Sequence, residues 1–511
     1  MKKRIPGLFL GLMMSVSILS GCDNQAGTPA PSTSAVQPAS APVEQTAPAE
    51  KTPKYVFLFI GDGMSHVQVN AAQVYTGNNK SGEVAMKNLN FTKFPVAGVA
   101  TTYDSTSFCP DSASTATSIS CGVKTHSGVI GLNVDKTTKP QSITEKLKAA
   151  GMKIGIVSSV TINHATPAAF YAHIASRNDY YEIAEQLANS NFDYFGGGAI
   201  SEPTGKDKTK PDVTETIKSK GYKVVNTKND ILALNSSSGK VYAVNPVLQD
   251  SGSIPYAIDT KADDLTLSDY VKKGIDVLDN EKGFFMMCES GKIDWACHAN
   301  DALSTITDTL AFEKAIQVAV DFADKHPDDT LILVTGDHET GGMTIGYAAT
   351  GYNTAFDILG RQKMSYIAFD SLITDMKKNN PKLTLNDVLP VIKENFGLLA
   401  PSDPDAKIEA NKAYTLTDYE FEKLESGFAE SMKPTDKRTK NPETDLLYST
   451  YDPLSVTLTH IINNKAGIGW TSYAHTGTPV PVYAMGVGAE QFGGSYDNTD
   501  IFKKLISVCG L

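Results

Sequence analysis

Beyond its first 22 residues the chain has no apolar run long enough to cross a bilayer, so no second membrane span is expected. It also has no basic cluster, because 46 lysines and arginines stand against 57 aspartates and glutamates, a net charge of -11. A general nucleic-acid-binding surface is therefore not expected. No internal repeat of fixed period is present. With 511 residues, 41% of them hydrophobic and 20% charged, the sequence predicts a globular body with a large core.

Cysteine is scarce, with six residues in the whole chain. One of them, Cys22, lies in the N-terminal segment, and five remain in the body of the protein. Because five is an odd number, at least one thiol must be unpaired or joined to another molecule. The sequence predicts no particular pairing among Cys109, Cys121, Cys288, Cys297 and Cys509.

The first residues have the layout of a bacterial export signal. A basic start, Lys2 to Arg4, precedes an apolar stretch from Leu8 to Leu19, and Leu19-Ser20-Gly21-Cys22 resembles a lipobox. The resemblance implies that residues 1–21 are a lipoprotein signal peptide and that Cys22 becomes an acylated N-terminus. The protein would then be exported and lipid-anchored to a membrane, in the periplasm or at the cell surface. An ordinary cleaved signal followed by a chance cysteine is the alternative.

The remaining chain divides into a tether and one large domain. Residues 22–53 are rich in Ala, Pro, Ser, Thr and Gln, a composition that predicts a disordered tether before a domain over residues 54–511. Within the domain, residues from about 346 to 457 differ in having polar, Lys- and Asn-rich segments. Helical patterns over Tyr366–Lys378 and Asp418–Met432 predict that this stretch is a folded insertion between two core strands.

Short apolar runs alternate with amphipathic stretches from Tyr55 onwards, which is typical of an α/β fold. We predict a three-layer sandwich with a doubly wound, largely parallel central sheet. Its candidate strands are Tyr55–Ile60, Lys153–Ser158, Phe284–Cys288, Thr330–Val334 and Val480–Gly486.

Acidic residues follow three of these strands: Asp62 the first, Glu289 the third, and Asp337 with His338 the fourth. One such acid could simply cap a helix. Three at the carboxyl ends of strands, where ligands of such sheets collect, indicate a shared site. Unpaired carboxylates brought together would repel and protonate, so the pattern predicts neutralising cations.

Two further patterns suit metal ions but are weak when taken alone. The spacing Asp294-x-x-x-His298 places a carboxylate and an imidazole on one side of a turn or short helix, which suits zinc. The adjacent pair Asp337-His338 can converge on one ion from a loop. A surface aspartate with a hydrogen-bonded histidine, or a simple turn, would give the same sequences.

Small residues surround Ser112 in the segment Cys109–Thr117, which continues into an Ala- and Ser-containing helical stretch. The hydroxyl of Ser112 is therefore expected at or near a helix N-terminus, where backbone N–H groups favour an anion. A serine at that position could also be only the N-cap of the helix.

Together these segments resemble the alkaline phosphatase family. The resemblance covers nearly the whole chain from Tyr55 to the end, apart from the insertion, and rests on separate motifs in the family's order. The motifs are Gly61-Asp62-Gly63-Met64, Asp111-Ser112-Ala113 through Thr117, Ala165-Thr166-Pro167 with Arg177 downstream, Glu289 to His298, Thr335 to Glu339, and His475-Thr476-Gly477.

This resemblance implies hydrolysis of phosphate monoesters over a broad substrate range, through a phosphoserine formed on Ser112. It also implies two zinc ions and a third metal, usually magnesium. Carried over by position, the ligand sets are Asp294, His298 and His475 for one zinc; Asp337, His338 and Asp62 for the second, with Ser112 as the attacking ligand; and Asp62, Glu289 and Thr166 for the third metal.

Two more expectations come from the same resemblance. Arg177 would bind two phosphate oxygens through its fork of donors, a geometry that lysine cannot reproduce. Family members are commonly homodimers, so a homodimer is expected, with the insertion either clasping the partner subunit or acting as a substrate lid.

The chain departs from the best-known bacterial pattern at two substrate-site positions. His164 stands where some relatives have Asp, and Trp295 stands where some have Lys. The same combination occurs in marine bacterial relatives, so activity is expected to survive. His164 would weaken the preference of the third site for magnesium and allow zinc there. Trp295 would loosen the product phosphate by removing a positive charge.

Two alternatives remain open. A phosphodiesterase or phosphonate hydrolase of the same superfamily shares the metal ligands, although such enzymes often use Thr as the nucleophile. Ser112 and Arg177 favour monoesters, because Arg177 needs two free phosphoryl oxygens. An alternative of another class is a non-catalytic lipoprotein that binds metal and phosphate, with Ser112 as a ligand only.

Overall fold

The structure, a computed structural model, describes residues 51–77 and 84–511. The predicted signal peptide, Cys22 and nearly all of the tether lie outside these residues. Within the described part of the chain, no helix is both long enough and apolar enough to cross a membrane. The five described cysteines, Cys109, Cys121, Cys288, Cys297 and Cys509, form no disulfide with one another.

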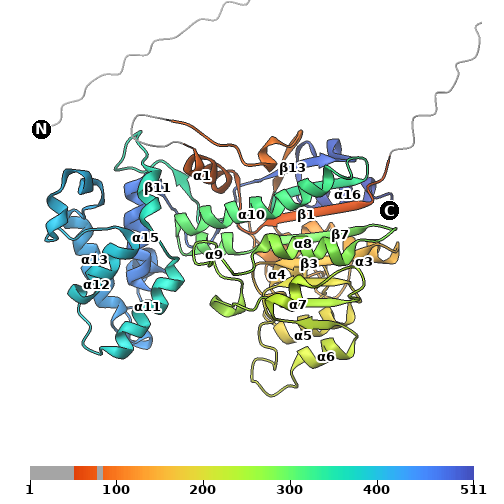
Figure 1. Ribbon diagram of the computed structural model, residues 1–511, viewed down its shortest axis with the longest axis horizontal. Coiled ribbons are helices and arrows are strands. Elements are labelled where there is room, and N and C mark those ends of the chain that lie inside the picture. Colours follow the sequence, from red (N-terminus) through yellow and green to blue (C-terminus); the bar gives the residue numbers. More distant parts are fainter. Residues whose placement is uncertain (1–50, 78–83) are drawn as a thin grey trace, which may run out of the picture. The chain divides into compact units, whose positions relative to one another are not determined.

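A ten-stranded sheet runs through the domain, as Figure 1 shows. All its neighbouring strands are parallel except at β13, which is antiparallel to both of its neighbours, β2 and β8. In sheet order the strands are β14 (Gly494–Asp497), β2 (Val96–Thr101), β13 (Val480–Gly486), β8 (Thr330–Gly336), β1 (Tyr55–Gly61), β7 (Phe284–Ser290), β3 (Lys153–Ser158), β4 (Tyr194–Gly197), β6 (Val241–Val244) and β5 (Lys223–Val225).

All five strands expected from apolar runs are present, and the predicted α/β sandwich with a largely parallel sheet is confirmed. The strands that the sequence did not predict are mostly short. β4 has four residues, two of them glycine, and β5 has three. Segments of that length show no periodicity of their own and depend on their neighbours in the sheet.

Helices cover both faces of the sheet because alternate residues of its strands point to opposite sides. On one side, Phe57, Phe59 and Met286 pack with α1 (His66–Thr76), α8 (Leu267–Leu278), α9 (Lys292–His298) and α10 (Ala302–Ala323). Leu58 and Met287 point to the other side. There they meet α2 (Ser112–Cys121), α3 (Ile143–Ala149), α4 (Ala165–Ala168), α5 (Tyr180–Asn189), α6 (Val213–Ser219) and α16 (Thr499–Val508).

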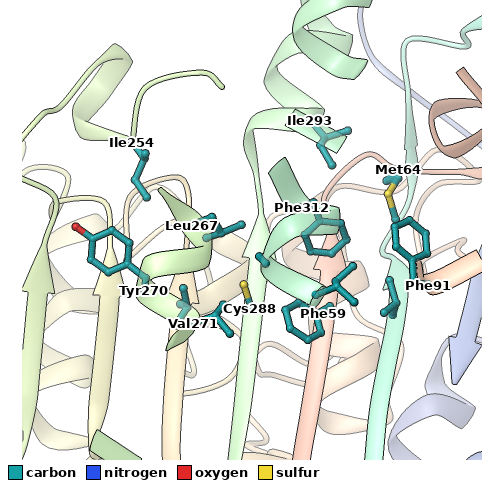
Figure 2. Packing of buried hydrophobic residues seen from close by; sticks show 14 of the residues in the cluster. Phe59, Met64, Phe91, Ile254, Leu267, Tyr270, Val271, Cys288, Ile293 and Phe312 are labelled. Atoms are coloured by element: carbon teal, nitrogen blue, oxygen red, sulfur yellow. The ribbon is translucent and has the colours of Figure 1, made fainter. Parts of the chain in front are cut away.

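The first of these layers has an aromatic centre, seen in Figure 2. The Phe59 ring lies 6.3 Å from Phe57 and 5.9 Å from Phe312 of α10, measured between centroids. Both arrangements, stacked and edge-on, are favourable for aromatic pairs. The central strand β1 and the long helix α10 are thereby fixed to each other.

The segment expected as an insertion leaves the core at β10 (Thr344–Ile345) and returns at β11 (Ile468–Gly469), and these two strands pair antiparallel. Its helices gather on one side in Figure 1 and have an apolar cluster of their own, to which Phe369, Leu424 and Leu458 contribute. The expected end near residue 457 falls inside the last helix. The helices are α11 (Tyr366–Asn379), α12 (Leu385–Phe396), α13 (Asp418–Ser431), α14 (Pro442–Tyr448) and α15 (Pro453–Ala466).

The central strands are in register at their carboxyl ends. Ile60 of β1 pairs with Glu289 of β7 on one side and with Thr335 of β8 on the other. The residues that follow, Asp62 and Asp337, therefore emerge beside Glu289. A small second pairing, β9 (Glu339–Thr340) with β12 (His475–Thr476), brings His475 to the same edge.

The aromatic centre gives a stability prediction. Replacing Phe59 by Ala leaves a cavity under β1 and α10, so the free energy of unfolding is expected to fall by about 3–5 kcal/mol in denaturant titration. Tyr352→Ala is the matched control, because that ring is fully exposed, and its change is expected to stay within about 0.5 kcal/mol. Equal losses in both variants would contradict the assignment of this core.

Candidate active site

Ser112 is the first residue of α2, and the preceding residue, Asp111, is its N-cap. The Asp111 side chain accepts a hydrogen bond of 3.1 Å from the backbone N–H of Ser114. The alternative that Ser112 is itself the N-cap is therefore wrong. Its hydroxyl instead lies 3.4 Å from Asp62 Oδ1 and 3.2 Å from His338 Nε2, in a side chain that is 1% exposed.

Asp294, His298 and His475 form the first group of side chains that could hold a metal. The helix α9 carries Asp294 and His298 one turn apart, as their spacing predicts, and the β9–β12 pairing adds His475. Asp294 Oδ1 lies 3.4 Å from His298 Nε2 and 3.6 Å from His475 Nε2. Two ligands at zinc–nitrogen or zinc–oxygen distance in a tetrahedron are about 3.3 Å apart, so these separations suit one ion.

The hydrogen bonds of the two imidazoles give a stronger test of this group. His298 Nδ1 donates to the carbonyl of Tyr473, and His475 Nδ1 donates to the carbonyl of Pro110. An imidazole in its neutral form has one N–H, which in each ring is used by this hydrogen bond. The two Nε2 atoms, 3.1 Å apart, then face each other with lone pairs and no proton between them. A cation resolves that contact, so the residues present fit a metal.

A second group surrounds His338. Its Nε2 lies 3.1 Å from Asp62 Oδ1 and 3.5 Å from Asp337 Oδ2, beside the Ser112 hydroxyl. Asp62, Asp294 and His338 have ligand atoms close enough for one ion. Asp337 is held in place by hydrogen bonds from the Gly63 N–H, at 3.2 Å, and the Thr115 hydroxyl, at 3.0 Å. Asp294 thus borders both of these groups, which the sequence did not predict.

The third group combines Asp62, His164 and Glu289. Four buried atoms here have no hydrogen-bond partner: Asp62 Oδ2, His164 Nδ1, Thr166 Oγ1 and Glu289 Oε1. Buried polar atoms are normally paired, because each unpaired one costs about 1–3 kcal/mol. Four such atoms around one point, three of them on residues expected as ligands of the third metal, also fit a cation.

The electrostatics agree with this geometry. Burial raises the pKa of Asp62 well above its ordinary range, and the charges of Asp294 and Glu289 add to the effect. Burial likewise raises the pKa of Asp337 to about 8 and that of Glu289 to about 7. Without cations these carboxylates therefore compete for protons near neutral pH.

Asp294 and His475 behave differently. Burial by itself would raise the pKa of Asp294, but the neighbouring imidazoles, led by His298, hold it below the ordinary value. Burial lowers the pKa of His475 to about 3. The ring is neutral at physiological pH, which is the form that binds a metal.

Arg177 lies at the opening of the site, in contact with Asp111 and His164. One guanidinium nitrogen donates to Asp111 Oδ2 at 2.8 Å, and the other lies 3.2 Å from His164 Nε2. Burial together with the charge of Arg177 lowers the pKa of His164 to about 3. The His164 ring also meets the Trp295 ring edge-on at 5.8 Å. The structure thus brings all the expected site residues in the described chain to one edge of the sheet.

A pocket of about 480 Å³ opens over these residues and is lined by Ser112, His164, Arg177, Trp295 and several residues that sequence reasoning missed. Asp111 could have been found, since it stands next to Ser112. Thr115, which donates to Asp337, lies within the motif that begins at Asp111, and Thr340, which donates to Asp294, directly follows the motif Thr335 to Glu339. Asp250, Tyr366, Tyr451 and Tyr473 carry no local signal.

The fold and the site together define a metal-dependent α/β hydrolase. The family model of the alkaline phosphatases matches residues 53–511. The chain belongs to the alkaline phosphatase family and is a phosphomonoester hydrolase.

Individual relatives agree. The chain is 32% identical over 492 residues to alkaline phosphatase 4 of Bacillus subtilis, covering 91% of this chain and 93% of that protein. The crystal structure of a cold-active alkaline phosphatase from a Shewanella species is similar with a TM-score of 0.72 and 27% identity, over 89% of this chain and 99% of that one. The Thermus thermophilus alkaline phosphatase has a TM-score of 0.72 at 25% identity, over 93% and 96%.

The raised pKa values give a prediction for the metal-free protein. Asp337 and Glu289 bind protons more tightly in the folded state than in the unfolded chain, so they stabilise the fold only while protonated. As pH rises from about 4 toward 8, the free energy of unfolding is expected to fall, by about 1.4 kcal/mol per pH unit for one such group. Chelated protein unfolded by denaturant at several pH values measures this slope.

Two controls accompany that titration. Protein saturated with divalent metal should lose the slope, because bound cations replace the protons. Asp337→Asn should make the slope of the chelated protein shallower. A flat profile for the chelated wild type would show that the crowded carboxylates do not titrate in this range.

Proposed function

We propose that Ser112 is the nucleophile of this phosphomonoesterase and that phosphate is released from a phosphoserine. One observation carries the proposal: the buried Ser112 Oγ lies 3.2 Å from His338 Nε2 and 3.4 Å from Asp62 Oδ1, where a shared ion would also contact it. A broad substrate range, which the resemblance to the alkaline phosphatase family implies, is part of the proposal.

The proposed cofactors are two zinc ions and a third metal, magnesium or zinc. When bound, these ions neutralise the carboxylates, favour the ionised form of the Ser112 hydroxyl and polarise phosphoryl oxygens. The residues that would hold them are Asp294, His298 and His475; Asp62, Asp337 and His338; and Asp62, Glu289 and Thr166.

The protein's own groups account for positioning. Ser112 Oγ forms the new bond to phosphorus while the bond to the ester oxygen breaks, and water later cleaves the phosphoserine. Arg177 is oriented by Asp111 and presents its donors to two phosphoryl oxygens of the substrate. A diester has one free oxygen fewer, so this clamp favours monoesters over the phosphodiesterase and phosphonate hydrolase alternatives.

At the third site we propose that His164 weakens the preference for magnesium. Its neutral ring brings one negative charge fewer than an aspartate would, and imidazole suits zinc better than a hard cation. Solved structures of the TAB5 alkaline phosphatase, with a histidine changed to Glu or Asp, are described as having Mg bound in the M3 site. That description supports the idea for a site of the same kind here.

Trp295 is proposed to speed product release by keeping a positive charge away from the phosphate. The Lys292 ammonium lies 4.8 Å from the Trp295 ring centroid and is fully buried. Trp295→Lys would place a charge in the pocket itself and should strengthen inhibition by phosphate.

The location and assembly of the protein are proposals too. Export with a lipid anchor at Cys22 rests on the sequence of the first 22 residues, and the intact mass of the exported protein decides it. A homodimer is proposed from the resemblance to the alkaline phosphatase family, whose members are commonly homodimers. Light scattering before and after deletion of the insertion tests both the dimer and the insertion's part in it.

Catalysis by Ser112 predicts that Ser112→Ala lowers kcat on a nitrophenyl monoester by at least about 10³-fold, with the fold unchanged by circular dichroism. Chelation should abolish the activity and added zinc with magnesium should restore it. The matching diester should react far more slowly than the monoester. Comparable monoester and diester rates would favour the phosphodiesterase alternative.

The non-catalytic alternative makes the opposite prediction. Metal-loaded protein quenched at low pH after exposure to labelled substrate should carry phosphate on Ser112, located by peptide mass spectrometry. If wild-type protein binds phosphate but no phosphoserine is trapped and no turnover is seen, the chain is a binding protein.

His164→Asp tests the third site. The variant adds a carboxylate, so elemental analysis of protein equilibrated with both metals should show more magnesium and less zinc than the wild type. Ala348→Asp, at an exposed turn position of the insertion, is a control for the added charge alone. Full magnesium occupancy and no zinc at this site in the wild type would refute the proposal.

A further inference from the structure

The pocket above Ser112 has a second wall, opposite in character to the phosphate clamp. Four aromatic rings and one carboxylate form it: Trp295, Tyr366, Tyr451, Tyr473 and Asp250. Trp295 comes from α9 and Tyr366 begins α11. Tyr451 precedes α15 and Tyr473 precedes β12, so the wall is assembled from segments far apart in the chain.

The rings contact one another as a continuous surface. Tyr366 meets Tyr451 edge-on, with centroids 5.8 Å apart, and Tyr451 stacks on Tyr473 at 6.3 Å. Trp295 and Tyr451 both pack against the apolar cluster that contains Tyr366. Ring faces and edges held in this way offer electron-rich surface to a cation at several angles.

Asp250 supplies a carboxylate at the same wall. Its side chain is 19% exposed, so it is accessible from the pocket without being freely solvated. Its negative charge adds to burial in raising the pKa of Tyr366. Burial also raises the pKa of Tyr451, with contributions from Asp294 and Asp250. Tyr451 therefore lies within electrostatic reach of both the metal-ligand side and the Asp250 side of the pocket.

One positive charge, Lys292, lies behind this wall. Its ammonium is 3.7 Å from the Tyr256 ring centroid and 3.7 Å from Asp250 Oδ2, and it donates to the Ser253 hydroxyl at 2.9 Å. The side chain has no exposure. Burial lowers the pKa of Lys292 to about 8, against the opposing effect of nearby acids that include Asp250 and Asp308. The ammonium pairs with Asp250 from the buried side and so holds the Asp250 loop in place.

The backbone at this wall is strained. Among the described non-glycine residues, eight have positive φ angles, and three of them line the pocket: Asp250 (33°), Ser251 (59°) and Ser449 (50°). Such conformations persist where the surrounding structure holds them, often at ligand sites. All three of these residues line the same pocket.

We propose that this wall binds a cationic leaving group. The preferred substrates would then be phosphate monoesters of amino alcohols, of which phosphocholine is a representative example. The proposal rests on the phosphomonoesterase function proposed above and names its substrate class. The phosphate would face Ser112 and Arg177, and the ammonium would face Asp250 and the tyrosine rings. An apolar aryl leaving group would make no ionic contact with Asp250.

Paired substrates separate charge from shape. Metal-loaded full-length protein is assayed with phosphocholine and with its neutral isostere, in which a carbon atom replaces the choline nitrogen. The ratio of the two kcat/KM values, cation over isostere, is expected to be about tenfold or more. Because the positive nitrogen also makes choline a better leaving group, the change of this ratio in variants decides the question.

Asp250→Asn keeps the shape of the side chain and removes its charge, so the ratio should fall at least about fivefold. Asp263→Asn is the matched control, since that carboxylate is fully exposed and does not line the pocket, and it should leave the ratio unchanged. For the rings, Tyr451→Leu should lower the ratio, while Tyr451→Phe, which keeps the π face, should retain it. The tyrosine pair keeps the proposal testable if the Asp250 variant does not fold.

The outcomes are distinct. A wild-type ratio near one, or a ratio that stays within about twofold of wild type in Asp250→Asn and Tyr451→Leu, overturns this inference. Nitrophenyl phosphate serves as the common reference substrate. If the wild type hydrolyses it and the ratio does not respond, only the inference fails, whereas no hydrolysis at all means that the proposed function has failed.

Discussion

Carboxylates and imidazole lone pairs lie close together in a buried space at the carboxyl ends of the central strands. Cations between them are needed to neutralise their mutual repulsion, and the rest of the site depends on this requirement. His298 and His475 each donate a hydrogen bond from Nδ1 to a backbone carbonyl, and their Nε2 atoms lie next to each other. Asp62, Glu289 and Asp337 have raised pKa values because burial and mutual repulsion disfavour their charges. A protein without metals would gain nothing from such an arrangement, since every one of these contacts costs stability.

The parallel sheet is what makes the crowding possible. β1, β7 and β8 are in register, so their carboxyl ends deliver Asp62, Glu289 and Asp337 side by side. The apolar layers on both faces, with Phe59 and Phe312 at the centre of one, hold these strands against the repulsion that their acids create. Helix α2 then adds Ser112 at its N-terminus, with Asp111 as the cap, so that the serine hydroxyl remains available to the site.

Part of the fold and of the site could be predicted from the sequence because these features depend on residues that are close together in the chain. Five short apolar runs predict strands of the central sheet, and the spacing of Asp294 and His298 predicts a turn or short helix that places both on one side. β4 and β5 were missed because four and three residues carry no period of their own. The sequence also did not predict that Asp294 belongs to two ligand groups. That position depends on how α9 lies against β9, which the spacing of residues in the sequence does not show.

The sequence by itself determined the fold class, the family and the kinds of side chain that carry the chemistry, because those depend on apolar periodicity and short motifs. Tertiary structure alone decided which lone pairs face each other and which rings line the pocket. Tyr366 and Tyr451 of the insertion share the pocket with Asp250, Trp295 and Tyr473 of the rest of the domain only in the folded protein. Contacts between residues so far apart in the chain are fixed by packing, which no local pattern records.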